Sequence, residues 1–198
     1  MTDYFTLLNE PRRPWLDPDS LKEKFLALTA TVHPDRVHNL PAVEREQAQQ
    51  RFTELNAAYN CLREPRLRLR HLLELELGAK PSDLTQVPED LMNLFFTIGK
   101  TFREVDGFLA EKEKASSPLL KVQLFERGMD WTDALRQLQL DVNTRRDQLI
   151  EELRAVDAVW VSPAITALLA RVENIYRLLS FFDRWLAQLQ ERAGQLSF

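Results

Sequence analysis

The sequence predicts an all-α protein, because its apolar residues recur at helical spacing, no stretch alternates like a half-buried strand, and its prolines lie between the periodic segments. A proline inside a helix removes a hydrogen bond, so each proline here marks a boundary. Of the 198 residues, 44% are hydrophobic and 28% are charged, which suits one globular domain or two small ones. We expect an N-terminal helical hairpin followed by a C-terminal three-helix bundle.

Composition and charge exclude several classes of function. The formal net charge is -4, and neither half has the basic excess that is typical of nucleic-acid binders, so we expect no nucleic-acid partner. The longest apolar stretches are four residues, whereas a membrane span needs about 20. The start also lacks a basic signal region, so we expect a cytoplasmic protein with no membrane partner. Cys61 is the one cysteine, which leaves redox and cysteine-zinc chemistry without ligands.

Residues 1–78 have the pattern of a helical hairpin. A helix begins at Asp17-Pro18, since aspartate is a favourable N-cap and proline suits the first helical position. It ends at His33-Pro34, because proline disfavours the α conformation of the residue before it. A polar loop then leads to the second helix. The predicted segments are a short opening element at 4–8, helices at 18–32 and 41–64, and a basic and apolar segment at 66–77.

Residues 79–88 are predicted to be a linker, and residues 89–198 the three-helix bundle. Its helices are expected at about 89–114, from Pro118 towards Val156 with Gly128 as a candidate break, and from Ser162 as N-cap and Pro163 onwards. Apolar residues in the last helix alternate at spacings of three and four, which is a coiled-coil-like stripe that a bundle would bury. We expect the two modules to have limited contact and each to fold separately.

The motif that carries the functional prediction is His33-Pro34-Asp35. It lies between the two helices of the hairpin, after the opening Asp3-Tyr4-Phe5-Thr6-Leu7 and before the segment from Arg63 to Leu73. This combination resembles a J-domain, the module that stimulates ATP hydrolysis by DnaK-type chaperones. It is more closely similar to the HscB family, the J-domain co-chaperones of iron-sulfur cluster assembly. The resemblance extends over essentially the whole chain and is strongest over residues 3–77.

The resemblance implies a co-chaperone with no chemistry, cofactor or metal of its own, so we expect no enzyme. The implied partners are a DnaK/HscA-type ATPase chaperone and an IscU-type iron-sulfur scaffold protein. In such a site the proline rigidifies the loop, the aspartate accepts a hydrogen bond from an arginine of the partner, and cations steer the encounter. The implied chaperone-binding residues are His33, Pro34, Asp35, Lys22, Lys24 and Arg36.

The resemblance also implies a scaffold-binding site in the C-terminal module, on Leu91, Met92, Phe96 and Phe181. At about 100° per residue, Met92 and Phe96 turn away from the core stripe of their helix, to which Leu91 and Phe95 mainly belong. Members of the family mix apolar residues with carboxylates on this face, whereas this chain has Gly99 and Arg103 there.

Simpler interpretations stay open for each feature. The tripeptide could be an ordinary helix-ending turn, and the aromatic residues Phe96, Phe181 and Trp185 could be bundle core. The arginines from Arg63 to Arg70 are more typical of a solvated face than of a docking site. A metal site from His33, Asp35 and His38 would lack a fourth ligand, so we expect none. Alternative functions are a J-domain protein for a different client, and a helical adaptor or oligomerisation protein with a degenerate J-domain.

Overall fold

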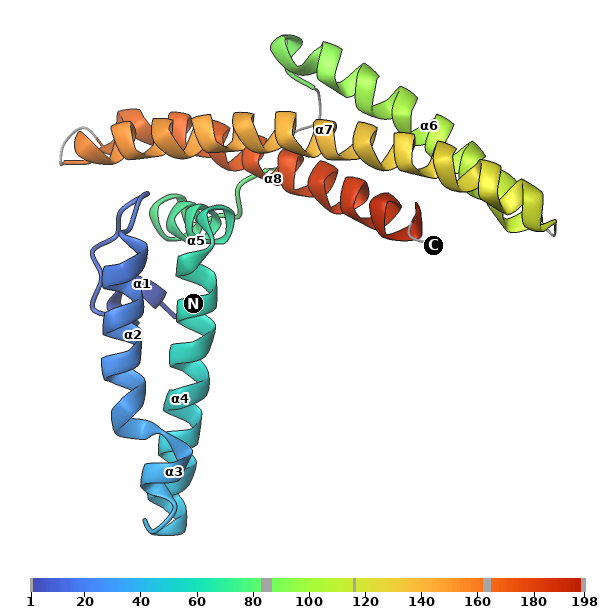
Figure 1. The fold of residues 1–198 in the computed structure, drawn as a ribbon. Coiled ribbons are helices and arrows are strands. Elements are labelled where there is room, and N and C mark those ends of the chain that lie inside the picture. The colour runs from blue at the N-terminus through green and yellow to red at the C-terminus, as the bar shows by residue number, and fades with distance from the viewer. Residues whose placement is uncertain (1, 83–86, 116, 162–164, 197–198) are drawn as a thin grey trace. The chain divides into compact units, whose positions relative to one another are not determined.

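The structure is a computed structural model that describes residues 2–82, 87–115, 117–161 and 165–196 (Figure 1). All regular elements in these ranges are helices, which confirms the predicted all-α class. They are α1 (Tyr4–Leu7), α2 (Pro18–Val32), α3 (Pro34–Val37), α4 (Ala42–Arg63), α5 (Pro65–Leu77), the 3-10 helix η1 (Glu89–Leu91), α6 (Met92–Lys114), α7 (Pro118–Ala158) and α8 (Ile165–Leu196).

The chain forms two compact units whose boundaries differ from the predicted modules. One unit contains Met1–Ser82 and Ile150–Tyr176, and the other contains Asp83–Leu149 and Arg177–Phe198. Parts of α7 and α8 therefore belong to the same compact unit as the N-terminal segment. The separate folding of residues 1–78 and 89–198 stays a prediction.

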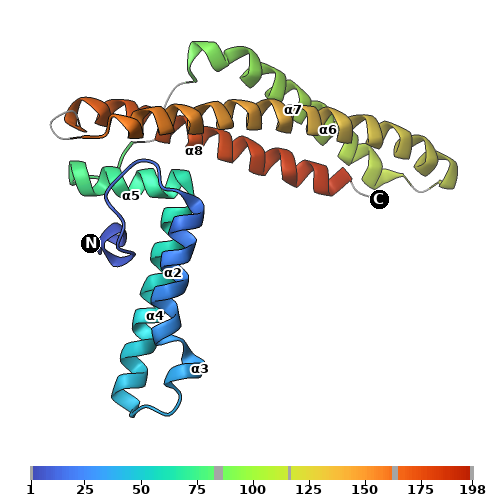
Figure 2. The same ribbon diagram turned by 60° about the vertical axis from the view of Figure 1, so that its left-hand side comes forward.

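The predicted helical hairpin consists of α2 and α4, which lie side by side with α3 at one end of the pair (Figure 2). The Asp17 carboxylate caps α2 by accepting the Ser20 N–H at 2.8 Å, as the sequence predicted. Between the helices, the rings of Phe25 and Tyr59 stack with centroids 4.2 Å apart. This packing makes α2 and α4 a firm support for the short connection that joins them, which we call the tip of the hairpin (residues 33–38).

The opposite end of the hairpin, where α1 and α5 pack, is held by a buried arginine. Arg68 is 4% exposed; its Nε donates to the Pro14 carbonyl at 2.9 Å and its Nη1 donates to the Leu62 carbonyl at 2.7 Å. Burial lowers the pKa of Arg68 to about 10, although the charge of Asp157 acts in the opposite direction. The expectation of a solvated arginine face is therefore wrong at Arg68, which is a structural residue.

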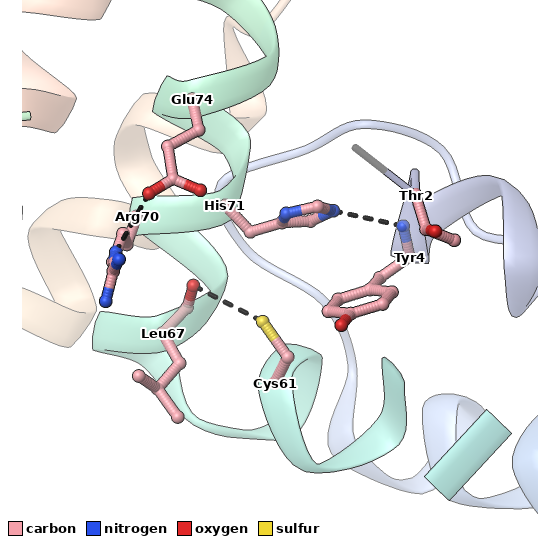
Figure 3. Close-up of a pocket in the computed structure, with 7 residues that line it drawn as sticks. All are labelled: Thr2, Tyr4, Cys61, Leu67, Arg70, His71 and Glu74. Carbon is pink, nitrogen blue, oxygen red and sulfur yellow. Dashed lines mark hydrogen bonds and ion pairs between the residues drawn. The ribbon is translucent and has the colours of Figure 1, made fainter. Parts of the chain in front are cut away.

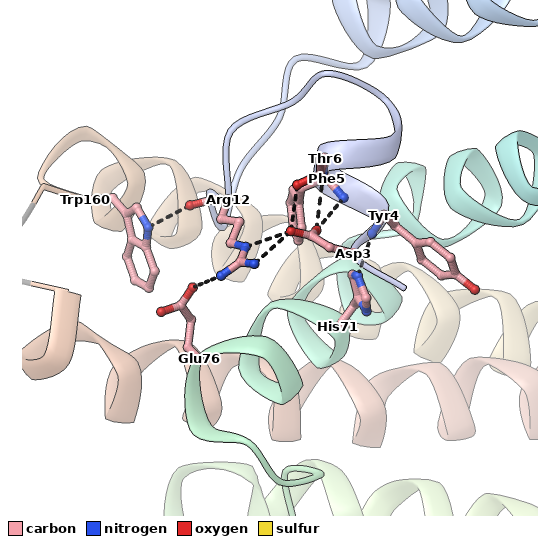
Figure 4. Close-up of polar contacts among 8 residues, drawn as sticks. All are labelled: Asp3, Tyr4, Phe5, Thr6, Arg12, His71, Glu76 and Trp160. Atoms are coloured by element: carbon pink, nitrogen blue, oxygen red, sulfur yellow. Dashed lines mark hydrogen bonds and ion pairs between the residues drawn. The ribbon is translucent and has the colours of Figure 1, made fainter. Parts of the chain in front are cut away.

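A second set of polar contacts fixes α1 at the same end (Figure 4). The Tyr4 N–H donates to His71 Nε2 at 3.0 Å, and burial lowers the pKa of His71. The Asp3 carboxylate accepts the Phe5 N–H at 3.0 Å and Arg12 Nε–H at 2.9 Å. Burial of Asp3 raises its pKa, but hydrogen bonds from Thr6 and Arg12 outweigh that effect and hold the pKa below its ordinary value.

The end of α7 contributes to this unit through contacts with residues 12–15. Arg13 Nε donates to Asp157 Oδ1 at 3.1 Å, and the Trp15 N–H donates to the same oxygen at 3.3 Å. Trp160 Nε1 donates to the Arg12 carbonyl at 3.0 Å. These partners are more than 140 residues apart in sequence, so no periodic pattern could have predicted them. We call four polar residues at this end, Asp3, Arg68, His71 and Asp157, the base of the hairpin.

In the second unit, η1, α6, α7 and α8 contribute to a single hydrophobic core, which agrees with the predicted bundle. Its buried members include Leu91, Ile98, Val105, Leu135, Val142, Phe182 and Leu189. The candidate break at Gly128 is wrong, because α7 continues through it and Thr132 Oγ1 donates to the Gly128 carbonyl at 2.8 Å. The predicted cap residues Ser162 and Pro163, and residues 83–86 of the predicted linker, lie outside the described residues.

Candidate chaperone-binding and client-binding sites

The tip of the hairpin is formed by the motif that the sequence singled out. His33 has an extended backbone, with φ -61° and ψ 135°, so it ends α2 and caps α3 at the same time. Its Nδ1 accepts the Asp35 N–H at 3.3 Å. Its ring meets the Phe52 ring of α4 edge-on, with centroids 5.6 Å apart. The backbone of Pro34 opens α3, whereas its side chain lies outside the described part of the structure.

The Asp35 carboxylate is more exposed than the His33 ring. Its side chain is 89% exposed, against 47% for His33, and one of its oxygens lies 3.6 Å from His33 Nδ1. The Asp35 carbonyl lies 2.8 Å from His38 Nδ1, which stabilises the turn of α3. Val37 is buried and anchors α3. The tip therefore offers an accessible anionic acceptor on a backbone that is fixed at both sides.

The three predicted cations differ in their surroundings. Lys22 and Arg36 are exposed, as a docking role requires. Lys24 Nζ instead lies 3.0 Å from the Glu10 carboxylate and donates to the Asn9 carbonyl at 3.3 Å. Because Lys24 holds the loop after α1 against α2, it is less available to a partner than the sequence suggested.

The predicted scaffold-binding residues are brought partly together in the second unit. Phe96 is 61% exposed, and Met92 and Phe181 are half-buried. Leu91 is 2% exposed and belongs to the bundle core. Leu91 therefore lies beneath the surface that the other three residues share, and its part in scaffold binding stays a prediction.

A row of aromatic rings connects the predicted residues of α6 and α8. The centroid distances along it are 5.7 Å from Phe96 to Phe95, 6.3 Å from Phe95 to Trp185 and 4.4 Å from Trp185 to Phe181. The sequence assigned Phe95 to the core, but it is 38% exposed, whereas Trp185 is 6% exposed. Phe95 is therefore part of the exposed row of rings, and the adjacent pair Phe95-Phe96 was the sign of it in the sequence. We call Met92, Phe95, Phe96 and Phe181 the aromatic surface.

Basic side chains border the aromatic surface. Arg103 is exposed one turn beyond the half-buried Gly99. The Arg184 guanidinium lies 5.7 Å from the centroid of the Phe181 ring, which is within the range of a cation-π contact. The surface therefore combines apolar area with positive charge near its edge.

Comparison with known proteins gives one consistent likeness. In sequence, the chain is 41% identical over 73 residues to the HscB co-chaperone homologue of Azoarcus sp. (strain BH72), and 44% identical over 72 residues to that of Bordetella pertussis. In structure, the HscB chaperone of Vibrio cholerae superposes with a TM-score of 0.64 at 19% identity, over 99% of this chain and 100% of that one. The human HscB co-chaperone gives 0.59 at 20% identity, over 98% and 81%.

The chain is similar to the HscB co-chaperones. The two sequence matches cover 37% and 36% of this chain, and the chain spans only 41% and 42% of the length of those relatives. The structural likeness to HscB covers almost the whole chain, so it accounts for the fold of both units. No family model matches the sequence. The resemblance to the HscB family that the motif predicted is confirmed by these matches.

Away from these surfaces, a pocket of about 330 Å³ lies beside the base of the hairpin (Figure 3). Cys61 lines it, and burial raises the pKa of this thiol to about 11, so the unreactive thiol form predominates. Arg70 and Glu74 pair across 2.9 Å at its edge. Within the described ranges, no three His, Cys, Asp or Glu side chains gather as metal ligands would. Nor does any described helix have the length and apolarity to cross a membrane.

Proposed function

We propose that the chain is an HscB-type co-chaperone that stimulates ATP hydrolysis by a DnaK/HscA-type chaperone and delivers an IscU-type scaffold protein to it. In this proposal it acts in the cytoplasm and catalyses no reaction itself. The observation that carries the proposal is the tip of the hairpin, where Asp35 is 89% exposed while its neighbour His33 is anchored to α4.

The geometry of the tip supports a docking role by preorganisation. A carboxylate can accept two hydrogen bonds from one arginine, and such a charge-assisted pair is stronger than a neutral one. Because the backbone of residues 33–37 is already fixed by α3 and the Phe52 ring, little conformational entropy is lost on binding. Lys22 and Arg36 would add electrostatic steering towards an acidic surface of the chaperone.

Single-turnover ATPase assays with a DnaK- or HscA-type chaperone test the proposed stimulation. We expect His33→Gln and Asp35→Asn each to abolish most of the stimulation while the helical circular dichroism is unchanged, because both side chains are exposed. Asp130→Asn, which removes an exposed carboxylate from α7, is the matched control and should stimulate like the parent. A parent chain that gives no stimulation, or variants that stimulate equally well, would refute the proposal.

The aromatic surface is the proposed site for the scaffold client. Apolar anchors of this size each contribute a few kcal/mol when a partner buries them. We expect Met92→Ala combined with Phe96→Ala to weaken capture of an IscU-type scaffold by the full chain, with little change in the melting temperature. Val43→Ala, at a 65% exposed position on α4, is the control for exposed apolar area. If the double variant instead melts much earlier, the two residues are core and the proposed site is wrong.

The salt dependence of capture, and the combination of capture with ATPase stimulation, distinguish the proposed function from its alternatives. With Arg103 where the family resemblance implies a carboxylate, capture by apolar contacts should depend little on salt concentration. Normal ATPase stimulation without capture of an IscU-type scaffold would favour a J-domain protein for a different client. Absence of both would favour a helical adaptor.

A further inference from the structure

The second unit exposes an apolar stripe along α7 that neither the tip of the hairpin nor the aromatic surface includes. At about 100° per residue its members lie within about 60° of one another. They also lie on the side of α7 away from Leu135, which is buried in the core. The exposed fractions are 62% for Val122, 47% for Phe125, 52% for Met129 and 59% for Leu140. We call these four residues the α7 stripe.

Two opposite charges lie at the centre of the α7 stripe. The Asp133 and Arg136 side chains are each 71% exposed, and they form an ion pair at 3.3 Å within the helix. An exposed pair at this spacing contributes little to stability. Both charges are therefore accessible to a partner that places a positive group opposite Asp133 and a negative group opposite Arg136.

A groove accompanies the stripe where α7 meets the end of α8. It has a volume of about 200 Å³ and lies between Phe125, Met129 and Thr132 of α7 and Leu196 of α8, with Asp133 and Arg136 at its edge. Leu196 lines the groove and is 1% exposed. The groove is thus an apolar recess beside a pair of charges, and its size suits one branched apolar side chain.

The order of these residues along α7 is self-complementary. The midpoint between Asp133 and Arg136 is also the midpoint between Met129 and Leu140. When two copies of α7 are antiparallel about a two-fold axis at that point, Asp133 of each copy faces Arg136 of the other. Leu140 of each copy then faces Met129 of the other and the groove beside it. A two-fold interface requires this property, because the same patch must serve both sides.

We propose that the α7 stripe is a homodimer interface, in which two copies of the chain pack antiparallel through residues 122–147, the range that a two-fold axis between residues 134 and 135 maps onto itself. Charge complementarity favours a second copy as the partner. Asp133 and Arg136, which pair with each other within one helix, would each pair with the opposite charge of the second copy. The contact covers about 38 Å of a single helix on each copy, which places it at the small end of specific interfaces. A dissociation constant in the micromolar range is the expected strength.

Sedimentation equilibrium on the full chain, from low micromolar to several hundred micromolar, tests the dimer directly. The expected result is a reversible shift from monomer to dimer mass, which Met129→Glu combined with Leu140→Glu abolishes. Val43→Glu places the same charge at an exposed apolar position of α4 and should leave the equilibrium unchanged. Thermal melts of each variant check that the monomer fold is intact. A parent chain that stays monomeric over the whole range overturns the proposal and assigns the stripe to another kind of partner.

Charge exchange tests the antiparallel arrangement itself. Asp133→Arg alone and Arg136→Asp alone each place like charges opposite one another, so each variant should dimerise at least several-fold more weakly. An equimolar mixture of the two variants restores both opposite-charge contacts and should form a heterodimer with near-parental affinity. Asp141→Arg, about 100° away from Leu140, is the control for the change in net charge. If the mixture is as weak as the separate variants, the proposed pairing is wrong.

Discussion

The base and the tip of the N-terminal hairpin use polar residues in opposite ways. At the base, Arg68 and Asp157 are 4% and 7% exposed and are enclosed by hydrogen-bond partners. At the tip, the side chains of Asp35 and His33 are 89% and 47% exposed. The charges at the base therefore stabilise the fold, whereas those at the tip are available to another molecule. Substitutions at the two ends should accordingly separate stability from activity.

The largest expected effect on stability is at Arg68. Arg68→Ala leaves the Pro14 and Leu62 carbonyls without their donor and removes the cation near Asp157. Loss of such a buried charge should lower the free energy of unfolding by about 3 kcal/mol. Urea titration followed by circular dichroism measures it. Arg63→Ala, at an exposed site on the same chain segment, should cost less than about 0.5 kcal/mol, and equal costs for both variants would contradict the contrast.

Nothing in the local sequence distinguishes Arg68 from the neighbouring arginines. The segment at 66–77 alternates arginines with leucines, and a charged residue in such a run is ordinarily solvated. One acceptor of Arg68, the Pro14 carbonyl, is 54 residues away in the sequence, and the nearby charge of Asp157 comes from α7. Such contacts depend on tertiary structure and leave no local pattern.

The features that the sequence did predict all have local causes. Helix limits at Asp17 and His33 follow from capping and from proline sterics, which act between neighbouring residues. At the aromatic surface, periodicity placed Phe96 on the exposed side correctly but placed Phe95 in the core. Phe95 lies at the boundary between the two sides of its helix, where burial depends on which side chains of the neighbouring helix cover the residue. Here that side chain is Trp185 of α8.

The next largest expected effect is a dependence of the stability of the fold on pH, caused by His71. Burial lowers the pKa of His71 below its ordinary value of 6.5, so the unfolded chain binds a proton at a pH where the folded chain does not. The contribution of neutral His71 to the free energy of unfolding is therefore complete above pH 6.5. It is lost as the pH falls from 6.5 towards the lower pKa of His71 in the folded protein. Asp3, Glu74 and Arg12 also act on His71, and the two carboxylates partly oppose the shift.

Melting temperatures between about pH 8 and about pH 5 test this dependence. His71→Gln keeps an acceptor for the Tyr4 N–H but does not titrate, so its stability should change less over the range. A parent and variant with the same pH profile would show that His71 does not contribute.

A smaller stability effect, with a larger functional one, is expected at Phe52. Its ring contacts His33 edge-on at 5.6 Å, and loss of an aromatic pair costs about 1 kcal/mol. Phe52→Leu keeps apolar volume but removes that contact, so the tip should lose part of its preorganisation. We expect weaker ATPase stimulation that more co-chaperone can restore. Stimulation at parental strength would mean that the ring does not position the motif.

The most direct test compares the two ends of the hairpin in one assay. Asp35→Asn should change the free energy of unfolding by less than about 0.5 kcal/mol and abolish stimulation of a DnaK- or HscA-type ATPase. Arg68→Ala, measured at a temperature where it is still folded, should stimulate nearly as well as the parent. Both activities are read against the folded fraction from circular dichroism. Full stimulation by Asp35→Asn, or its loss in folded Arg68→Ala, would contradict the division between a stabilising base and a functional tip.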